Sequence, residues 1–186
     1  TACSNWQKLA RQAEEFAPDA VVIADERWYG DLREALAHLP VKVYAGTEAI
    51  EQVVRGDSAD VVVNALVGYA GMMPSLAAVE TGKKLALANK ESLVIAGKQI
   101  IEAADRNGAA ILPVDSEHSA IFQSLVGEVS PARRLILTAS GGPFLHTPKE
   151  RLCEVTVEQA LRHPNWSMGA KITVDSSTMV NKGFEV

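Results

Sequence analysis

The feature that most constrains the fold is a regular alternation of short apolar runs with amphipathic segments. Each run has the length of a strand, and several are almost continuously apolar, as strands covered on both faces must be. The expected strands lie at residues 20–24, 41–44, 60–66, 84–88, 109–114 and 133–139, with a further one at 171–174. This alternation predicts an α/β fold built on a doubly wound parallel sheet.

The segments between these runs carry helix signals. The clearest helix follows Glu91 and ends at Asn107-Gly108, and five apolar residues share one of its faces: Leu93, Ala96, Ile100, Ile101 and Ala104. Three further helix starts are indicated by Thr47 after Gly46, by Pro74, and by a capping box from Thr147 to Glu150.

Composition excludes several classes of protein. The 186 residues are 47% hydrophobic, enough to bury a core, while the net charge of -5 and scattered basic residues argue against nucleic-acid binding. Apolar runs are too short for a membrane span, and no charged leader precedes them. Cys3 and Cys153 form no C-x-x-C pair, which favours a reducing compartment. We therefore expect a soluble intracellular protein, and a fragment, because Thr1-Ala2-Cys3 resembles a strand end.

Polar or glycine-rich residues follow five successive apolar runs. In parallel sheets, ligands bind beyond the carboxyl ends of the strands, so these residues are the first candidates for a site. The five stretches are LVGYAGMMP at 66–74, Asn89-Lys90-Glu91, Asp115-Ser116-Glu117-His118, Ser140-Gly141-Gly142-Pro143 and Asp175-Ser176-Ser177-Thr178. Five such ends together predict one shared cleft.

Each stretch also has a purely structural interpretation. Asp115 is a natural N-cap with Glu117 in the first helical turn, and Asn89 is a natural cap for a helix that begins near Glu91. The stretch after Ala139 fits a simple turn, although its hydroxyl and backbone N–H groups also suit a phosphate. The residues taken singly leave both interpretations open.

The set of acids favours a metal site. Asp115 and Glu117 are separated by one residue, so both can reach one cation if the backbone turns between them. Carboxylates without nearby cysteines suit Mg²⁺ or Mn²⁺ better than structural Zn²⁺. Glu185 in NKGFE is a candidate third ligand, and Asn181 and Lys182 beside it suit an anionic substrate.

Four long segments carry a resemblance to a known family. LANKESLV-x-AG, LPVDSEHSAIFQSL, LTASGGPF and RHPNWSMGAKITVDSSTMVNKGFE occur in this order and resemble the 1-deoxy-D-xylulose 5-phosphate reductoisomerase family. The resemblance implies an NADPH-dependent enzyme of non-mevalonate isoprenoid biosynthesis that uses Mg²⁺, Mn²⁺ or Co²⁺ and converts its substrate to 2-C-methyl-D-erythritol 4-phosphate. It further implies a homodimer that binds a small sugar phosphate, in the bacterial cytoplasm or, alternatively, the plastid stroma.

The resemblance also implies a domain division. Residues 1–114 would form a Rossmann-like NADPH-binding domain that lacks the family's glycine-rich fingerprint, which lies upstream of Thr1. Residues 115–186 would form part of an α/β catalytic domain whose helical C-terminal extension lies downstream.

Residue roles carry over from the matching motifs. Metal ligands would be Asp115, Glu117 and Glu185. Catalytic residues would be Lys90, Glu117, His118 and His163, with His118 either orienting the acids or moving a proton. Substrate would contact Lys90, Ser116, Glu117, Ser140, His163, Trp166, Ser176, Asn181, Lys182 and Glu185, with Trp166 on a mobile flap. Cofactor would contact Ser4, Asn5, Asn89, Glu91, Met168 and Gly169.

Two alternatives remain open at the level of sequence. Another two-domain NAD(P)-dependent dehydrogenase would share the sheet without needing converging carboxylates, so metal dependence separates it. A non-catalytic sugar-phosphate-binding module would keep the polar set around Ser140 and Lys182 without a nicotinamide, so cofactor dependence separates that one.

Overall fold

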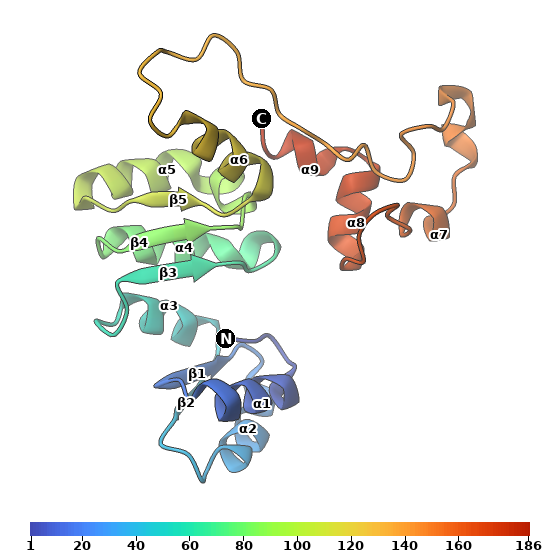
Figure 1. Ribbon diagram of the computed structural model, residues 1–186. Helices are drawn as coiled ribbons and strands as arrows, with labels where there is room; N and C mark the ends of the chain where they lie inside the picture. Colours follow the sequence, from blue (N-terminus) through green and yellow to red (C-terminus); the bar gives the residue numbers. More distant parts are fainter.

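The computed structural model describes residues 1–186, with helices packed against short parallel strands (Figure 1). The strands are β1 (Ala20–Ile23), β2 (Lys42–Ala45), β3 (Val61–Asn64), β4 (Lys84–Leu87) and β5 (Ile111–Pro113). The α-helices are α1 (Trp6–Phe16), α2 (Tyr29–Ala35), α3 (Thr47–Arg55), α4 (Met72–Glu80), α5 (Glu91–Asn107), α6 (Ser116–Leu125), α7 (Val157–Ala160), α8 (Ala170–Ser177) and α9 (Val180–Gly183). Short 3-10 helices are η1 (Glu26–Trp28), η2 (Gly68–Gly71) and η3 (Lys149–Glu154).

All strand pairs are parallel, which confirms the predicted α/β class. β1 pairs with β2, and β3, β4 and β5 form a second sheet in that order. Ala2 adds one parallel bridge to Ile23, so the start of the chain lies along β1 as the sequence suggested. The strands thus fall into two sheets that are not hydrogen-bonded to each other, rather than one continuous sheet.

Each sheet has its own apolar core. Leu9, Ala13 and Leu32 of α1 and α2 pack with β1, and the partly buried Val43 of β2 joins them. In the second sheet, Leu85 of β4 and Ile100 of α5 are completely buried, in a cluster that α4 and α5 form with the strands. This second layer fixes the carboxyl ends of β3, β4 and β5, from which the loops discussed below emerge.

Most helix signals are confirmed. α5 runs from Glu91 to Asn107, and Gly108 ends it with a φ of 65°. α3 begins at Thr47, and Pro74 lies in the first turn of α4. The capping box predicted at Thr147–Glu150 is wrong, because η3 begins after Pro148 without a side-chain cap. A capping box forms instead at Thr156, where Thr156 and Gln159 bond to each other's backbone N–H groups.

Two predicted strands are also wrong. Residues 133–139 form no regular element, because no neighbouring strand pairs with them, and Leu135 and Ile136 are largely exposed. KITV at 171–174 lies within α8, where the Thr173 hydroxyl donates to the Gly169 carbonyl four residues earlier. β-branched residues disfavour a helix only slightly, so local hydrogen bonds and ion pairs prevail over their strand preference.

The second half of the chain returns to the end of the second sheet. An irregular path leads away from α6 at residues 126–148, and α8 and α9 then bring the C-terminus back near the carboxyl ends of β4 and β5 (Figure 1). None of the helices combines the length and the apolar character that a membrane span requires.

Candidate functional site

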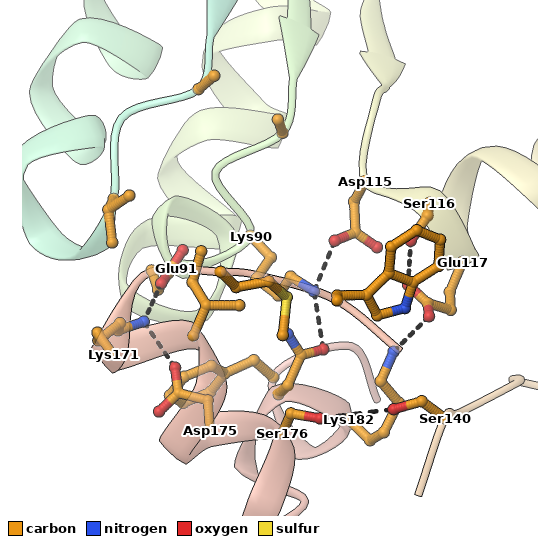
Figure 2. Close-up of a pocket in the computed structure, with 18 of the residues that line it drawn as sticks. Lys90, Glu91, Asp115, Ser116, Glu117, Ser140, Lys171, Asp175, Ser176 and Lys182 are labelled. Atoms are coloured by element: carbon orange, nitrogen blue, oxygen red, sulfur yellow. Dashed lines mark hydrogen bonds and ion pairs between the residues drawn. The ribbon is translucent and has the colours of Figure 1, made fainter. Parts of the chain in front are cut away.

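A cleft of about 370 Å³ lies where the strand ends of the second sheet face α8 and α9 (Figure 2). One wall comes from the loops after three strands: Ala65, Leu66, Val67, Ala88, Lys90, Glu91, Asp115, Ser116 and Glu117. The other wall comes from the second half of the chain: Ser140, His163, Trp166, Met168, Lys171, Ile172, Asp175, Ser176, Asn181, Lys182 and Phe184. The predicted shared cleft is therefore present.

Three carboxylates converge at one end of this cleft. One oxygen from each of Asp115, Glu117 and Glu185 lies within 4.8 Å of the other two. Asp115 follows β5, Glu117 lies in the first turn of α6, and the completely buried Glu185 side chain follows α9. The fold thus assembles the oxygen set that the spacing of the acids suggested.

Two lysines balance these acids. Lys90 Nζ lies 2.6 Å from Asp115 Oδ2 and also contacts Glu185 Oε1. Lys182 Nζ lies 2.7 Å from Glu117 Oε1 and 2.6 Å from Glu185 Oε2. With three acids and two bases the cluster keeps one net negative charge, which suits a cation.

Two of the carboxylate oxygens are buried without a hydrogen-bond donor: Asp115 Oδ1 and Glu185 Oε2. Glu185 Oε2 is close to Lys182, but the contact is a charge contact that lacks hydrogen-bond geometry. Buried acceptors without a donor are costly unless a ligand or ion satisfies them. The donor set therefore fits a hard divalent cation.

The charges of this cluster reinforce one another. Burial by itself raises the pKa of Glu117, but hydrogen bonds from Lys182 and Ser116 outweigh it and leave the pKa lowered. Burial likewise acts to lower the pKa of Lys90, and the bonds to Asp115 and Glu185 more than offset it, so that pKa is raised. At neutral pH the acid and the lysine are both charged.

The capping interpretation holds in part for both residues: Asp115 is the N-cap residue of α6 with Glu117 in the first turn, and Asn89 directly precedes Lys90, the N-cap residue of α5. Asp115 makes no side-chain hydrogen bond to the start of α6. Asn89 is only 2% exposed, and its Oδ1 accepts from the backbone N–H of Ser92 at 3.0 Å. Its Nδ2 donates to the carbonyls of Leu66 and Gly68 at 2.6 and 3.0 Å. The Asn89 side chain is thus committed to holding the 66–68 loop.

A second polar cluster lines the same cleft, and its Ser140 lies near Lys182 (Figure 2). Ser140 Oγ lies 3.1 Å from His163 Nε2 and 3.5 Å from Ser176 Oγ. His163 Nδ1 accepts from the backbone N–H groups of Asn165 and Trp166 at 3.2 and 3.1 Å, so Nε2 carries the proton and donates to Ser140. Hydroxyl and imidazole donors of this kind suit an anionic ligand group.

Gly142 makes this second cluster possible. A Cβ at Gly142 would lie 2.6 Å from the Ser176 carbonyl oxygen, and its φ is 66°. Only a residue without a Cβ allows the 140–143 loop to approach α8 so closely.

Twelve predicted residues line the cleft: Lys90, Glu91, Asp115, Ser116, Glu117, Ser140, His163, Trp166, Met168, Ser176, Asn181 and Lys182. Six others do not. Glu185 and Asn89 lie beneath it, and Gly169 precedes α8. His118 Nε2 bonds to the Glu185 carbonyl at 3.0 Å. Ser4 and Asn5 lie away from it, and Asn5 caps α1 by accepting from Lys8 N.

Several residues of the site were missed. Lys171 contacts Glu91 and Asp175 inside the cleft, and the spacing of Lys171 and Asp175 is the i, i+4 spacing of a helix. This signal was hidden because KITV was interpreted as a strand. Asn64 was also missed, and an asparagine within an apolar run was its signal: it donates to Ser75 Oγ and to the Gly71 carbonyl, both at 2.7 Å.

Fold and site together define an α/β protein whose acidic, lysine-lined cleft lies at the carboxyl ends of parallel strands. A family model described as 1-deoxy-D-xylulose 5-phosphate reductoisomerase matches residues 1–97, and one described as the C-terminal domain of that enzyme matches residues 111–186. The chain belongs to the 1-deoxy-D-xylulose 5-phosphate reductoisomerase family.

Similar proteins span the whole chain. Proteins named 1-deoxy-D-xylulose 5-phosphate reductoisomerase from Porphyromonas gingivalis and Bacteroides fragilis are 55% and 57% identical to it. Each alignment covers 100% of this chain, and the chain spans about half the length of these curated relatives, 48% in both cases.

Solved structures agree with these relatives. A DOX-P reductoisomerase in complex with NADPH, fosmidomycin and magnesium matches with a TM-score of 0.89 at 40% identity, over 100% of this chain and 48% of that one. The Zymomonas mobilis enzyme in complex with NADPH matches with a TM-score of 0.86 at 44% identity, over 99% and 48%.

Proposed function

We propose that the natural protein carrying this chain is an NADPH- and divalent-metal-dependent reductoisomerase. It converts 1-deoxy-D-xylulose 5-phosphate to 2-C-methyl-D-erythritol 4-phosphate. The observation that carries the proposal is the convergence of Asp115, Glu117 and Glu185 in the same cleft as the Ser140–His163–Ser176 cluster. The names of the relatives, and the NADPH and magnesium in related solved structures, support it.

The acidic end of the cleft would hold the metal. Asp115, Glu117 and Glu185 would provide oxygen ligands to Mg²⁺, Mn²⁺ or Co²⁺, and Asp115 Oδ1 accepts no hydrogen bond, with His118 Nδ1 3.8 Å away. When bound, the ion would supply positive charge to substrate oxygens on which negative charge develops, and NADPH would supply the hydride. His118, bonded to the Glu185 carbonyl, would orient this ligand rather than move a proton.

The remaining residues would bind and orient the substrate. Ser140, His163 and Ser176, with Asn181 and Lys182, would hold the phosphate end through hydroxyl, imidazole, amide and ammonium donors. Lys90 and Ser116 would contact the sugar oxygens beside the acids. Trp166, 65% exposed at the cleft, would cover the bound substrate and exclude water.

The cofactor would lie along the wall formed by the β3 and β4 loops. Leu66 and Val67 line the cleft together with Met168, and this apolar surface suits a nicotinamide ring. Glu91 stands at the edge of this wall, whereas the buried Asn89 would act by holding the loop. Gly169 would lie nearby, and Ser4 and Asn5 would contact the cofactor only in parts beyond this cleft.

We also propose a division at Val114, with residues 1–114 serving cofactor binding and 115–186 serving metal and substrate. This boundary follows β5, after which the acids begin. A homodimer and the bacterial cytoplasm, with the plastid stroma as the alternative, complete the proposal.

The test measures NADPH oxidation by the natural full-length protein with 1-deoxy-D-xylulose 5-phosphate and Mg²⁺ or Mn²⁺. We expect turnover that a chelator abolishes and that Glu117→Gln reduces by at least about a hundredfold, because one of three metal ligands loses its charge. Metal-independent turnover would favour a dehydrogenase of another kind. Binding of the sugar phosphate by a folded protein that never oxidises NADPH would favour a non-catalytic module.

A further inference from the structure

Lys171 touches three different parts of the cleft wall. It is the second residue of α8, and its Nζ contacts Glu91 Oε1 at the start of α5 (Figure 2). The same nitrogen lies 2.9 Å from Asp175 Oδ2, one turn further along α8, and 5.5 Å from the centre of the Phe184 ring. Phe184 directly precedes Glu185, so this one ammonium group connects the candidate cofactor side with the candidate metal side.

We propose that Lys171 is a positioning residue that clamps Glu91 to α8 and thereby sets the place of the Glu91 carboxylate for the cofactor. This inference rests on the proposed function and adds to it a residue outside the set that the sequence motifs assigned. Its basis is the three-way contact of Lys171 with Glu91, Asp175 and Phe184.

The charges around Lys171 show why a cation is needed there. Glu91 and Asp175 bind the same nitrogen, so at most two hydrogen-bond lengths separate their carboxylates. Both acids are more than four-fifths buried, while Lys171 is 44% exposed and opens toward the cleft. Without Lys171 the two negative charges would repel each other across the junction of α5 and α8.

Glu91 is also restrained from its other side, which makes Lys171 the adjustable part of the clamp. Asn89 Nδ2 donates to Glu91 Oε2 at 3.2 Å, and Asn89 itself is fixed by Leu66, Gly68 and Ser92. Glu91 Oε2 is therefore held by the loops that follow β3 and β4, and Glu91 Oε1 is held by Lys171 of α8. Loss of Lys171 would release only Oε1.

The test is a double-mutant cycle in the natural full-length protein, with Lys171→Met, Glu91→Gln and both together. NADPH affinity is measured by its fluorescence, without turnover, and stability by urea unfolding. Lys171→Met should weaken NADPH binding by about three- to tenfold. This is the effect expected from losing a charged hydrogen bond whose strength is reduced because Lys171 is partly exposed to solvent. Because Lys171 acts through Glu91, adding Lys171→Met to Glu91→Gln should change affinity by less than about twofold.

Two controls complete the design. Lys171→Arg retains the charge and should restore most of the affinity. Lys98→Met removes an exposed lysine of α5 that pairs weakly with Glu102 at 3.8 Å, and it should change nothing. Three results would each overturn the inference. NADPH affinity could be unchanged in Lys171→Met, or the fold-changes of Lys171→Met and Glu91→Gln could multiply in the double variant. Lys171→Met and Lys171→Arg could also lose equal NADPH affinity.

Failure of the proposed function has a different signature. If the wild-type protein unfolds cooperatively but binds no NADPH, the proposed function fails and the inference falls with it. If the wild-type protein binds NADPH and the cycle is multiplicative, only the role of Lys171 is wrong.

Discussion

Substituting Gly142 by alanine should damage the phosphate end of the cleft while leaving its acidic end intact. The new Cβ would lie 2.6 Å from the Ser176 carbonyl oxygen, 0.8 Å short of the 3.4 Å at which ordinary contact begins. The Cβ is fixed directly to the backbone of Gly142, and the oxygen belongs to the backbone of α8, so neither can rotate away. The 140–143 loop must therefore move away from α8. A shift of this size away from α8 would carry Ser140 Oγ beyond hydrogen-bond reach of Ser176 Oγ, which lies on α8 and is already 3.5 Å away.

The kinetic effect follows from that displacement. Loss of one hydrogen bond to a charged phosphate costs about 1.5–3 kcal/mol, so we expect KM for 1-deoxy-D-xylulose 5-phosphate to rise by about ten- to a hundredfold. kcat should change little, because phosphate contacts are made equally in the ground state and the transition state. The assay is steady-state NADPH oxidation at saturating metal.

Gly127→Ala is the matched control for backbone strain. Gly127 also has a positive φ, 83°, but nothing lies within 4 Å of a Cβ built there. Both variants should lose about 1 kcal/mol of stability to the unfavourable φ, and only Gly142→Ala should lose substrate affinity. An unchanged KM in Gly142→Ala, or an equal rise in Gly127→Ala, would refute the reasoning.

Three further predictions concern other parts of the site. Gly71→Ala places a Cβ 2.5 Å from the Asn89 side chain and should lower the free energy of unfolding in urea by about 2–4 kcal/mol; a loss below about 1 kcal/mol would contradict the packing. Burial acts to raise the pKa of Glu91, but its bond to Lys171 leaves it below the ordinary 4.5. The pair therefore stabilises the fold above about pH 4.5 and is lost on acidification, so Glu91→Gln should flatten the fall in urea midpoint between roughly pH 5 and 3. In a variant of the natural full-length protein whose other tryptophans are replaced by phenylalanine, the emission of Trp166 should shift to the blue when 1-deoxy-D-xylulose 5-phosphate and Mg²⁺ are added without NADPH, and an unshifted spectrum at saturation would argue against a closing flap.

Local chemistry made part of this site predictable. Asp115 and Glu117 follow an apolar run, and the carboxyl end of a parallel strand is where ligands bind, so their shared position could be inferred from the sequence alone. The same rule placed Lys90 and Glu91 after β4. Capping could not be decided from sequence, because Asp115 and Asn89 have equal propensity for it, and only the Lys90 ion pair and the Ser92 N–H separate them.

Other features depend on tertiary partners that a sequence does not display. KITV has strand propensity, yet it is helical because Lys171 and Asp175 pair one turn apart and Thr173 bonds to Gly169. Residues 133–139 have the composition of a strand, but a strand exists only beside another, and none pairs with them here. Whether a segment with strand propensity forms a strand thus depends on the neighbouring strands and side chains that it packs against.

Asp115, Glu117 and the buried Glu185 already have counter-charges in Lys90 and Lys182, so a metal ion at the acidic end of the cleft would have to exchange with these lysines. Under the proposed function, a divalent cation among Asp115, Glu117 and Glu185 would replace the two ammonium groups as their counter-charge, and the lysines would then be free to face an incoming anion. Cation and anion would therefore help each other to bind, since each would supply the counter-charge that the other displaces. Salt would compete with both, so the occupancy of this end would depend on ionic strength more steeply than the binding of either ligand alone.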